Sequence, residues 1–258
     1  MKLVRAKKNL GQHFLTDNNI AQDIVNALSG TYTNILEVGA GMGILTKILL
    51  EQSQYNTHVV EIDGESVVYL QKHFPSLGNR LWHEDFLQMN FEQKINCPFA
   101  LIGNFPYNIS SQILFKVLDN KELIPEVVGM FQKEVAQRIA SKPNNKDYGI
   151  LSVLLQAYYD IEYLFTVHEN VFNPPPKVKS AVIRLKRNNV EKLNCDEQIF
   201  KFIVKTAFNQ RRKMLRNSLK NIDFDKDFFS EEIFNKRPEN LSVEDYVFLS
   251  QNVIRTEL

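Results

Sequence analysis

Seven short runs rich in valine, isoleucine, leucine and aromatic residues alternate with segments of helical periodicity between residues 34 and 187. Runs of this length and composition are typical of strands buried on both faces, as in a parallel sheet covered by helices. The expected strands are Asn34–Val38, Thr57–Ile62, Arg80–Glu84, Phe99–Gly103, Glu126–Phe131, Asp160–Thr166 and Val178–Lys186. The pattern predicts a doubly wound α/β domain with a Rossmann-like, seven-stranded mixed sheet.

The strand-like runs stop after Arg187, and the polar segment 188–194 reads as a linker. Beyond the linker, Phe200, Ile203 and Val204 follow helical spacing, and Ser242 to Asp245 forms a candidate capping box. We therefore expect two domains: the α/β domain over residues 1–187 and a small all-helical domain over residues 188–258.

The composition describes an ordinary globular protein, with 44% apolar and 24% charged residues in a chain of 258. Cys97 and Cys195 lie far apart and have no nearby Cys or paired His, so the sequence indicates no metal site and favours a reducing compartment. No stretch approaches the roughly 18 apolar residues of a membrane-spanning helix. We expect a cytoplasmic protein that has no membrane attachment and acts as a monomer.

The net charge of +1 hides an uneven distribution of charge. Seven bases and no acid lie between Lys201 and Lys220, and they include Arg211, Arg212, Lys213 and Arg216. Five acids follow directly, between residues 223 and 232. A basic run of this kind is typical of a surface that binds phosphates, but a solvated helix face is an equally good interpretation of it.

A glycine-rich loop, Gly39-Ala40-Gly41-Met42-Gly43, follows the first strand of the α/β domain. Glycines allow the backbone to approach a ligand because no Cβ stands in the way. In a dinucleotide fingerprint the third glycine would come one residue later, at position 44, which is Ile44 here. The loop therefore argues against a nicotinamide-dependent oxidoreductase.

Acidic residues end the next two strands. Glu61, followed by Ile62, comes about 20 residues after the glycine loop, where a carboxylate can accept hydrogen bonds from ribose hydroxyls. Asp85, followed by Phe86, can bind an adenine amine while the adenine ring packs on apolar neighbours. A strand-end acid by itself is usually a helix cap, but three features at three successive strand ends form the pattern of a class I S-adenosylmethionine-dependent methyltransferase.

The fourth strand leads into Asn104-Phe105-Pro106-Tyr107, the most specific motif in the chain. The amine of adenine is a poor nucleophile because its lone pair is delocalised into the ring. Asn104 could accept one N6 hydrogen while a backbone carbonyl of the turn accepts the other, which would localise the lone pair. Pro106 would stiffen the turn, and Tyr107 would stack on an extruded base. In isolation, the same four residues could form an ordinary turn.

At this point the sequence resembles a known family, the ribosomal RNA adenine N6-dimethyltransferases, and within it the small-subunit (KsgA-type) branch. The resemblance covers nearly the whole chain in order and spacing. Its matching elements are 9–15 (NLGQHFL), 37–43, 60–63, 84–86, 103–109, 132–135, 171–178 and 207–213.

The resemblance implies a cofactor, S-adenosylmethionine, and a site for it. Gln12, His13 and Leu15 would close over its methionine end, with Gly39 beneath. The full set of cofactor-binding residues that we expect is Gln12, His13, Leu15, Gly39, Gly41, Glu61, Ile62, Asp85, Phe86 and Asn104. His13 is expected to have a structural role and not to transfer protons.

The resemblance also implies a substrate, the small-subunit rRNA of an immature small ribosomal subunit. Two adjacent adenosines in a hairpin near the 3′ end of 16S rRNA would be dimethylated at N6 during small-subunit biogenesis. Asn104, Pro106 and Tyr107 would be the catalytic residues, and Phe172 would form a second aromatic wall for the base, although a core phenylalanine is the alternative interpretation. The RNA-binding residues would be Arg211, Arg212, Lys213 and Arg216.

Two other functions remain open from the sequence. One is methylation of adenine N6 in large-subunit rRNA, and the other is a mainly non-catalytic role in ribosome assembly. The first differs from the leading hypothesis in its RNA substrate, and the second differs in whether a methyl group is transferred at all.

Overall fold

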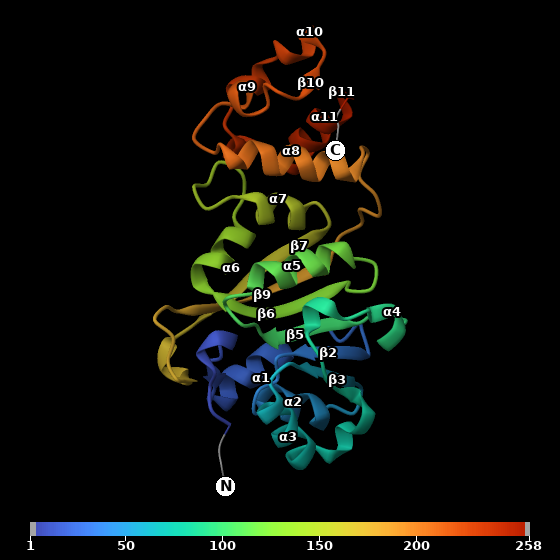
Figure 1. The fold of residues 1–258 in the computed structure, drawn as a ribbon, viewed down its shortest axis with the longest axis vertical. Helices are drawn as coiled ribbons and strands as arrows, with labels where there is room; N and C mark the ends of the chain where they lie inside the picture. The colour runs from blue at the N-terminus through green and yellow to red at the C-terminus, as the bar shows by residue number, and fades with distance from the viewer. Residues whose placement is uncertain (1–3, 256–258) are drawn as a thin grey trace. The chain divides into compact units, whose positions relative to one another are not determined.

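The computed structural model describes residues 4–255 and divides them into two compact units (Figure 1). Unit 1 comprises residues 4–136 and 161–187, and unit 2 comprises residues 137–160 and 188–255. Unit 1 ends at Arg187, where the sequence predicted the domain boundary, but residues 137–160 group with the C-terminal part of the chain. The division into functional domains stays a prediction.

Unit 1 is built on a seven-stranded sheet with the order β4-β3-β2-β5-β6-β9-β7. The pairs β4-β3, β3-β2, β2-β5 and β5-β6 are parallel, whereas β6 and β9 are antiparallel, so the predicted mixed sheet is confirmed. Its strands are β2 (Asn34–Val38), β3 (Asn56–Glu61), β4 (Leu81–His83), β5 (Ala100–Asn104), β6 (Glu126–Gln132), β7 (Tyr159–Val167) and β9 (Ser180–Arg187). The predicted ends agree to within two residues, the largest difference being the start of β9 at Ser180 instead of Val178.

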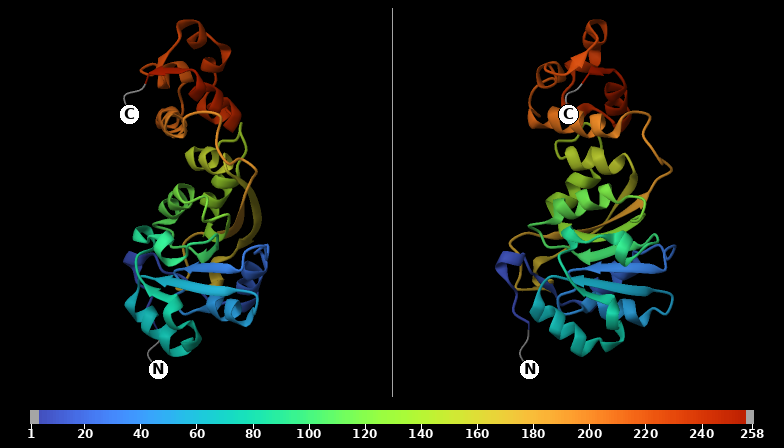
Figure 2. Two further views of the ribbon diagram at one scale, coloured as in Figure 1. Left: turned by 90° about the vertical axis from the view of Figure 1, so that its right-hand side faces the viewer. Right: turned by 45° about the vertical axis from the view of Figure 1, so that its right-hand side comes forward.

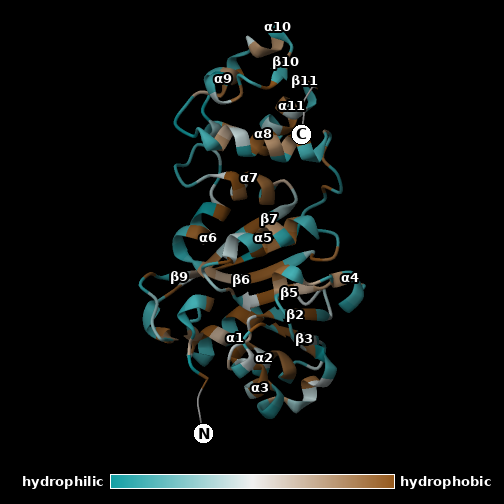
Figure 3. Ribbon diagram, viewed as in Figure 1, coloured by the Kyte–Doolittle hydropathy of each residue, from teal (hydrophilic) through white to brown (hydrophobic). Residues whose placement is uncertain are grey.

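Helices cover both faces of this sheet (Figure 2). They are α1 (Asn18–Asn26), α2 (Ile44–Glu51), α3 (Gly64–His73), α4 (Phe91–Lys94), α5 (Ser110–Asp119) and α6 (Lys133–Ala140), and the short 3₁₀ helices are η1 (Lys8–Leu10), η2 (Pro75–Arg80), η3 (Phe86–Gln88) and η4 (Glu169–Val171). Buried residues of α1 and α2, such as Ile24 and Leu49, pack on Ile35 and Ile102 of the central strands. Figure 3 colours strands β5 and β6, on which helices pack, mainly as hydrophobic. Alternate strand residues face the opposite side, so both faces of the sheet are apolar.

A second, two-stranded sheet in unit 1 joins segments that are far apart in the sequence. β1 (Phe14–Leu15) pairs antiparallel with β8 (Phe172–Asn173), and Leu15 lies opposite Phe172. Thr16 continues the contact, because its N–H and its hydroxyl both donate to the carbonyl of Val171 at 2.9 Å. Strands of two residues leave no periodic signal, and this pair was not predicted from the sequence.

Unit 2 is mainly helical. Its helices are α7 (Ile150–Gln156), α8 (Glu197–Asn209), α9 (Leu215–Ser218), α10 (Lys226–Phe229) and α11 (Val243–Gln251), with η5 (Glu232–Asn235) and η6 (Pro238–Asn240) between them. The predicted capping box at the start of α11 is present, because Ser242 and Asp245 each accept the other's backbone N–H. One detail differs from the all-helical expectation: β10 (Asp223–Phe224) pairs with β11 (Val253–Arg255), again through strands too short to leave a periodic signal.

Within the described residues, no helix is both long and apolar enough to span a lipid bilayer.

The turn after β5 is anchored by Phe105, whose side chain is buried beside two glycines. A Cβ added to Gly129 of β6 would lie 2.3 Å from Phe105 Cε2 and 2.6 Å from Phe131 Cε2. These distances leave no room for a side chain at position 129. Because Gly129 has no Cβ, the Phe105 ring can pack against β6, and this packing anchors the Asn104–Tyr107 turn.

We expect Gly129→Ala to lower the free energy of unfolding by about 1–3 kcal/mol, because overpacking forces buried rings out of place. The measurement is urea denaturation followed by the fluorescence of Trp82, the single tryptophan of the chain, which lies in β4. Gly64→Ala is the control, since its added Cβ would lie 3.5 Å from its nearest neighbour, an ordinary contact. Equal unfolding midpoints for the two variants would contradict the tight packing of Phe105 against Gly129.

Candidate functional site

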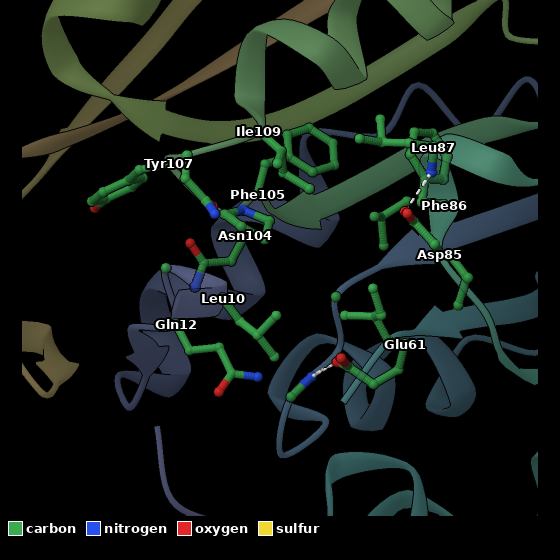
Figure 4. A pocket seen from close by; sticks show the side chains of 18 of the residues that line it. Leu10, Gln12, Glu61, Asp85, Phe86, Leu87, Asn104, Phe105, Tyr107 and Ile109 are labelled. Atoms are coloured by element: carbon green, nitrogen blue, oxygen red, sulfur yellow. Dashed lines mark hydrogen bonds between the residues drawn. The ribbon is translucent and has the colours of Figure 1, made fainter. Parts of the chain in front are cut away.

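A cavity of about 160 Å³ opens at the carboxyl ends of the parallel strands of unit 1 (Figure 4). It is lined by the N-terminal segment 10–14, the glycine loop after β2, and the segments that follow β3, β4 and β5. The predicted site residues that line it are Gln12, His13, Gly39, Gly41, Glu61, Ile62, Asp85, Phe86, Asn104, Pro106 and Tyr107. Parallel strands end at the same edge of a sheet, which brings together residues as far apart in the sequence as Gly39 and Tyr107.

The glycine loop passes directly beneath an aromatic ring. A Cβ added to Gly41 would lie 2.7 Å from Phe14 Cε1, and Gly41 has a φ of 56°, so glycine is required here on both counts. The sequence predicted close approach at this loop but gave no sign of Phe14, which lines the cavity from the N-terminal segment. The ring of Phe14 is therefore part of the cavity wall.

Glu61 ties the glycine loop to the end of β3. Its carboxylate, only 3% exposed, accepts the N–H of Gly41 at 2.8 Å and the N–H of Asp63 at 2.9 Å. Burial raises the pKa of Glu61, and the backbone hydrogen bonds partly oppose that effect. Each carboxylate oxygen has two acceptor positions, so Glu61 keeps capacity for a ligand hydroxyl.

Asp85 has two roles at the end of β4. Its Oδ1 accepts the N–H of Leu87 at 2.9 Å, which caps the 3₁₀ helix η3. The same residue lines the cavity beside Phe86 and Leu87, as Figure 4 shows. Both sequence interpretations of a strand-end acid, the cap and the ligand contact, are therefore compatible with its position.

The Asn104 side chain is oriented by a hydrogen bond across the site. Its Nδ2 donates to the carbonyl of His13 at 2.9 Å, and because a carbonyl can only accept, this bond assigns the nitrogen and leaves Oδ1 as the free acceptor. Figure 4 shows the amide in the cavity wall between Tyr107 and Gln12. A neutral acceptor in this place is what the predicted chemistry requires.

Tyr107 stands beside Asn104 and is fixed through its hydroxyl, which lies 2.5 Å from Ser180 Oγ in β9. Its ring stacks on that of His13, with centroids 5.5 Å apart and planes at 30°. Burial raises the pKa of the Tyr107 phenol. His13 in turn donates from Nδ1 to the carbonyl of Pro174 at 2.8 Å, so its imidazole connects two segments of backbone.

Two predicted site residues lie in the hydrophobic core. Leu15 and Phe172 are each 4% exposed and belong to one cluster of buried side chains. Leu15 also lines a smaller cavity of about 30 Å³ that shares Gly39 and Asn104 with the larger one. Phe172 lines neither of these cavities, and the ring that faces Tyr107 is that of His13. Stacking of Phe172 on a substrate base stays a prediction.

The four predicted RNA-binding residues lie after α8 in unit 2, and none of them is among the residues that line the cavity. Arg212, Lys213 and Arg216 are exposed. Arg211 is half-buried: it donates to the carbonyl of Lys146, its Nε lies 3.9 Å from Glu239 Oε2, and its guanidinium lies 6.0 Å from the Phe208 ring. These interactions give Arg211 a packing role within unit 2.

An ion pair and a hydrogen bond to Asp63, neither of which was predicted from the sequence, hold the N-terminal segment beside the cavity. Lys7 forms an ion pair with Asp63, which is 2% exposed, and Gln12 Nε2 donates to the same carboxylate at 3.4 Å. Burial favours the neutral acid, but the hydrogen bonds from Lys7, Ser66 and Gln12 outweigh it and lower the pKa of Asp63. No local pattern links Lys7 to Asp63, because 56 positions separate them.

A second buried acid, Glu37, lies under the glycine loop at the end of β2. Its Oε2 accepts the hydroxyl of Thr46 at 2.6 Å, and burial raises its pKa to about 8. The carboxyl is therefore largely protonated near neutral pH, as expected for a buried acid without a cationic partner.

Across residues 4–255, no group of three or more His, Cys, Asp or Glu side chains is arranged to hold a metal ion.

Residues 3–251 match the family described as "Ribosomal RNA adenine dimethylase". A relative from Cytophaga hutchinsonii, "Ribosomal RNA small subunit methyltransferase A", is 60% identical over 97% of this chain and 98% of its own length. A relative of the same name from Bacteroides fragilis is 57% identical over 98% of this chain and 94% of its own length.

Two solved structures share the fold. A dimethyladenosine transferase from Plasmodium falciparum aligns with a TM-score of 0.75 and 24% identity, covering 92% of this chain and 96% of the other. The 23S rRNA methyltransferase ErmE aligns with a TM-score of 0.66, also at 24% identity, covering 92% and 99%. At this identity the two structures establish the fold, a class I methyltransferase fold.

The protonation state of the buried Glu37 carboxyl can be tested through the pH dependence of stability. Its pKa is raised by folding, so its contribution to stability is complete below about pH 4.5 and is lost as the pH rises through 8. Glu37→Gln stays neutral and keeps an acceptor for Thr46. We expect the variant to gain stability over the parent protein by up to about 1.4 kcal/mol per pH unit between pH 5 and 8. The measurement is urea denaturation across this range, and a difference that does not vary with pH would refute the protonated carboxyl.

Proposed function

The chain belongs to the ribosomal RNA adenine dimethylase family, and we propose that it uses S-adenosylmethionine to dimethylate N6 of two adjacent adenosines in a hairpin near the 3′ end of 16S rRNA. Its relatives at 60% and 57% identity are named small-subunit methyltransferases, which favours the small subunit over the large subunit as substrate. The protein acts as a cytoplasmic monomer on the immature small ribosomal subunit.

The residues around the cavity fit the proposed cofactor. Two carboxylates, Glu61 and Asp85, lie at neighbouring strand ends, where ribose hydroxyls and an adenine amine need acceptors. Ile62, 49% exposed, and Phe86 offer apolar surface for the adenine ring, and Gly39 leaves the backbone of the loop bare. Gln12, His13, Leu15 and Gly39 are assigned to the methionine end. When bound, S-adenosylmethionine supplies an electrophilic methyl group on a sulfonium.

Asn104 prepares the nucleophile. Its Oδ1 accepts one N6 hydrogen of the target adenine, and a backbone carbonyl of the turn around Pro106 accepts the other. These bonds favour a tetrahedral nitrogen with a localised lone pair, which needs no strong base. The observation that carries this assignment is the hydrogen bond from Asn104 Nδ2 to the His13 carbonyl, which leaves Oδ1 as the acceptor end of the amide, on the side of Tyr107 in Figure 4.

Tyr107 orients the base. A hydroxyl held by Ser180 fixes the plane of the ring, on which an extruded adenine stacks. After one transfer, the methylated amine still carries one N–H, so the same contacts align it for a second transfer. Phe172 is proposed as the opposite wall, which requires its ring to leave the position that it has here.

A mainly non-catalytic role in ribosome assembly is the second candidate, and it rests on the exposed bases of unit 2. The experiment that separates the candidates is incubation with labelled S-adenosylmethionine and unmethylated small-subunit particles, followed by mass analysis of the nucleosides. Dimethyladenosine at two adjacent positions is the expected product. Binding to particles without any labelled nucleoside would favour the assembly role.

We expect Asn104→Ala to lower the rate of methyl transfer by about 100- to 1000-fold, the usual cost of removing one preorganised group that acts in the transition state. Single-turnover assays on small-subunit particles measure the rate, and calorimetry with S-adenosylhomocysteine measures cofactor binding. The loss of rate should greatly exceed any loss of cofactor affinity. Transfer at the parental rate would refute the role of the amide.

We expect the double variant Arg212→Glu/Arg216→Glu to weaken binding to small-subunit particles. The slope of log affinity against log salt should become shallower by roughly one unit for each phosphate that the variant no longer binds. Lys226→Glu is the matched control, because Lys226 is exposed in the same unit and lies outside the basic run. Arg211 is left unchanged, since it packs against Glu239 and Phe208. An unchanged slope would contradict the predicted RNA surface.

A further inference from the structure

We propose that Lys116 of α5 is a positioning residue, which holds the loop after β4 in the shape that receives the adenine of the cofactor. The inference rests on the proposed function, because it assigns the adenine end of the cofactor to this loop. Lys116 does not line the cavity, and nothing in its sequence surroundings distinguishes it from a solvated lysine.

Lys116 reaches the loop from the neighbouring helix. Its Nζ donates to the carbonyl of Leu87 at 2.8 Å and to the carbonyl of Met89 at 2.8 Å. Both carbonyls belong to the last turn of η3 and the residue that follows it. Carbonyls at the end of a helix lack intrahelical partners, and an ammonium group satisfies them with strong, charge-assisted bonds.

The same loop is held from its other side by the predicted ligand of adenine. Asp85 Oδ1 accepts the N–H of Leu87, while Lys116 binds the carbonyl of Leu87. The direction of the Asp85 carboxylate therefore depends on where Leu87 is held. Asp85, Phe86 and Leu87 all line the cavity, so a shift of this loop would move three parts of its wall.

The surroundings of Lys116 suit an ionised ammonium on a partly buried side chain. Its Nζ lies 5.0 Å from the centroid of the Phe91 ring and 6.0 Å from that of Phe86, distances typical of cation–π contacts. Burial lowers the pKa of Lys116, and the carboxylates of Asp85, Asp119 and Glu84 act in the opposite direction. The buried ring of Phe86 connects the ammonium to the cavity, because it contacts both.

Helix α5 also begins where the turn of the transfer site ends. Ile109, the residue before α5, lines the cavity together with Asn104 and Tyr107. Through Lys116, the rigid helix that continues this turn also fixes the adenine loop. The loop that is proposed to receive adenine and the turn that carries Asn104 are thus both attached to helix α5.

The test compares Lys116→Met, Lys116→Arg and the control Lys72→Met, in which an exposed lysine of α3 is replaced. Calorimetry gives the affinity for S-adenosylhomocysteine and for 5′-methylthioadenosine, which lacks the amino acid end. We expect Lys116→Met to bind both compounds about tenfold more weakly, by a similar factor. Its transfer rate at saturating cofactor should stay within about twofold of the parent. Lys116→Arg, which keeps the charge and several donors, should restore affinity to within about threefold.

Several results would overturn the inference. One is parental affinity in Lys116→Met, and another is a loss of transfer rate with cofactor affinity unchanged. A loss for S-adenosylhomocysteine but not for 5′-methylthioadenosine would place the effect at the wrong end of the cofactor. If Lys116→Met does not fold, Lys116→Gln carries the same comparison with a polar side chain. If the parent protein binds neither compound, the proposed function fails and the role of Lys116 fails with it, whereas parental affinity in Lys116→Met overturns the role of Lys116 alone.

Discussion

The hydrogen bond between Asn104 Nδ2 and the carbonyl of His13 is the interaction on which the site depends most. It joins the end of a central strand to a segment near the start of the chain, and in doing so it fixes two things at once. The amide oxygen is set on the side of Tyr107, as Figure 4 shows, and the N-terminal segment is held as one of the cavity walls. The His13 ring stacks on Tyr107, and its imidazole binds the carbonyl of Pro174, so a third segment of backbone is connected through the same residue.

The sheet supplies the rigidity that this hydrogen bond needs. Asn104 ends β5, which has parallel partners on both sides, and the next residue, Phe105, fills space that Gly129 leaves open. Side chains at the ends of such strands inherit the precision of the sheet, whereas side chains on long loops do not. Among the wall segments that follow strands of the seven-stranded sheet, the loop after β4 follows the edge strand, and it is the segment that Lys116 binds.

The sequence was sufficient for whatever follows from periodicity and from parallel strand ends. The strand pattern predicted the mixed sheet, and because parallel strands end together, Glu61, Asp85 and Asn104 could be placed in one site. The interactions between distant segments could not be predicted, since they depend on individual side chains meeting in space. The pairs Lys7 with Asp63 and Arg211 with Glu239 are of this kind. Phe172 shows the same limit, because no pattern distinguishes a buried phenylalanine from one that borders a cavity.

The N-terminal segment borders two ligand regions of the proposed site. Lys7 and Gln12 bind Asp63, two residues beyond the ribose-side carboxylate, while His13 packs on the ring proposed to receive the base. A target base that displaces His13 would also shift the backbone segment that carries Lys7 and Gln12. This segment borders the proposed cofactor site as well. Linkage then requires each to change the affinity of the other by an equal factor. If the enzyme modifies one nucleotide twice, as proposed, it has to exchange its donor between the steps, and a shared wall would tie that exchange energetically to whether the acceptor is still in place.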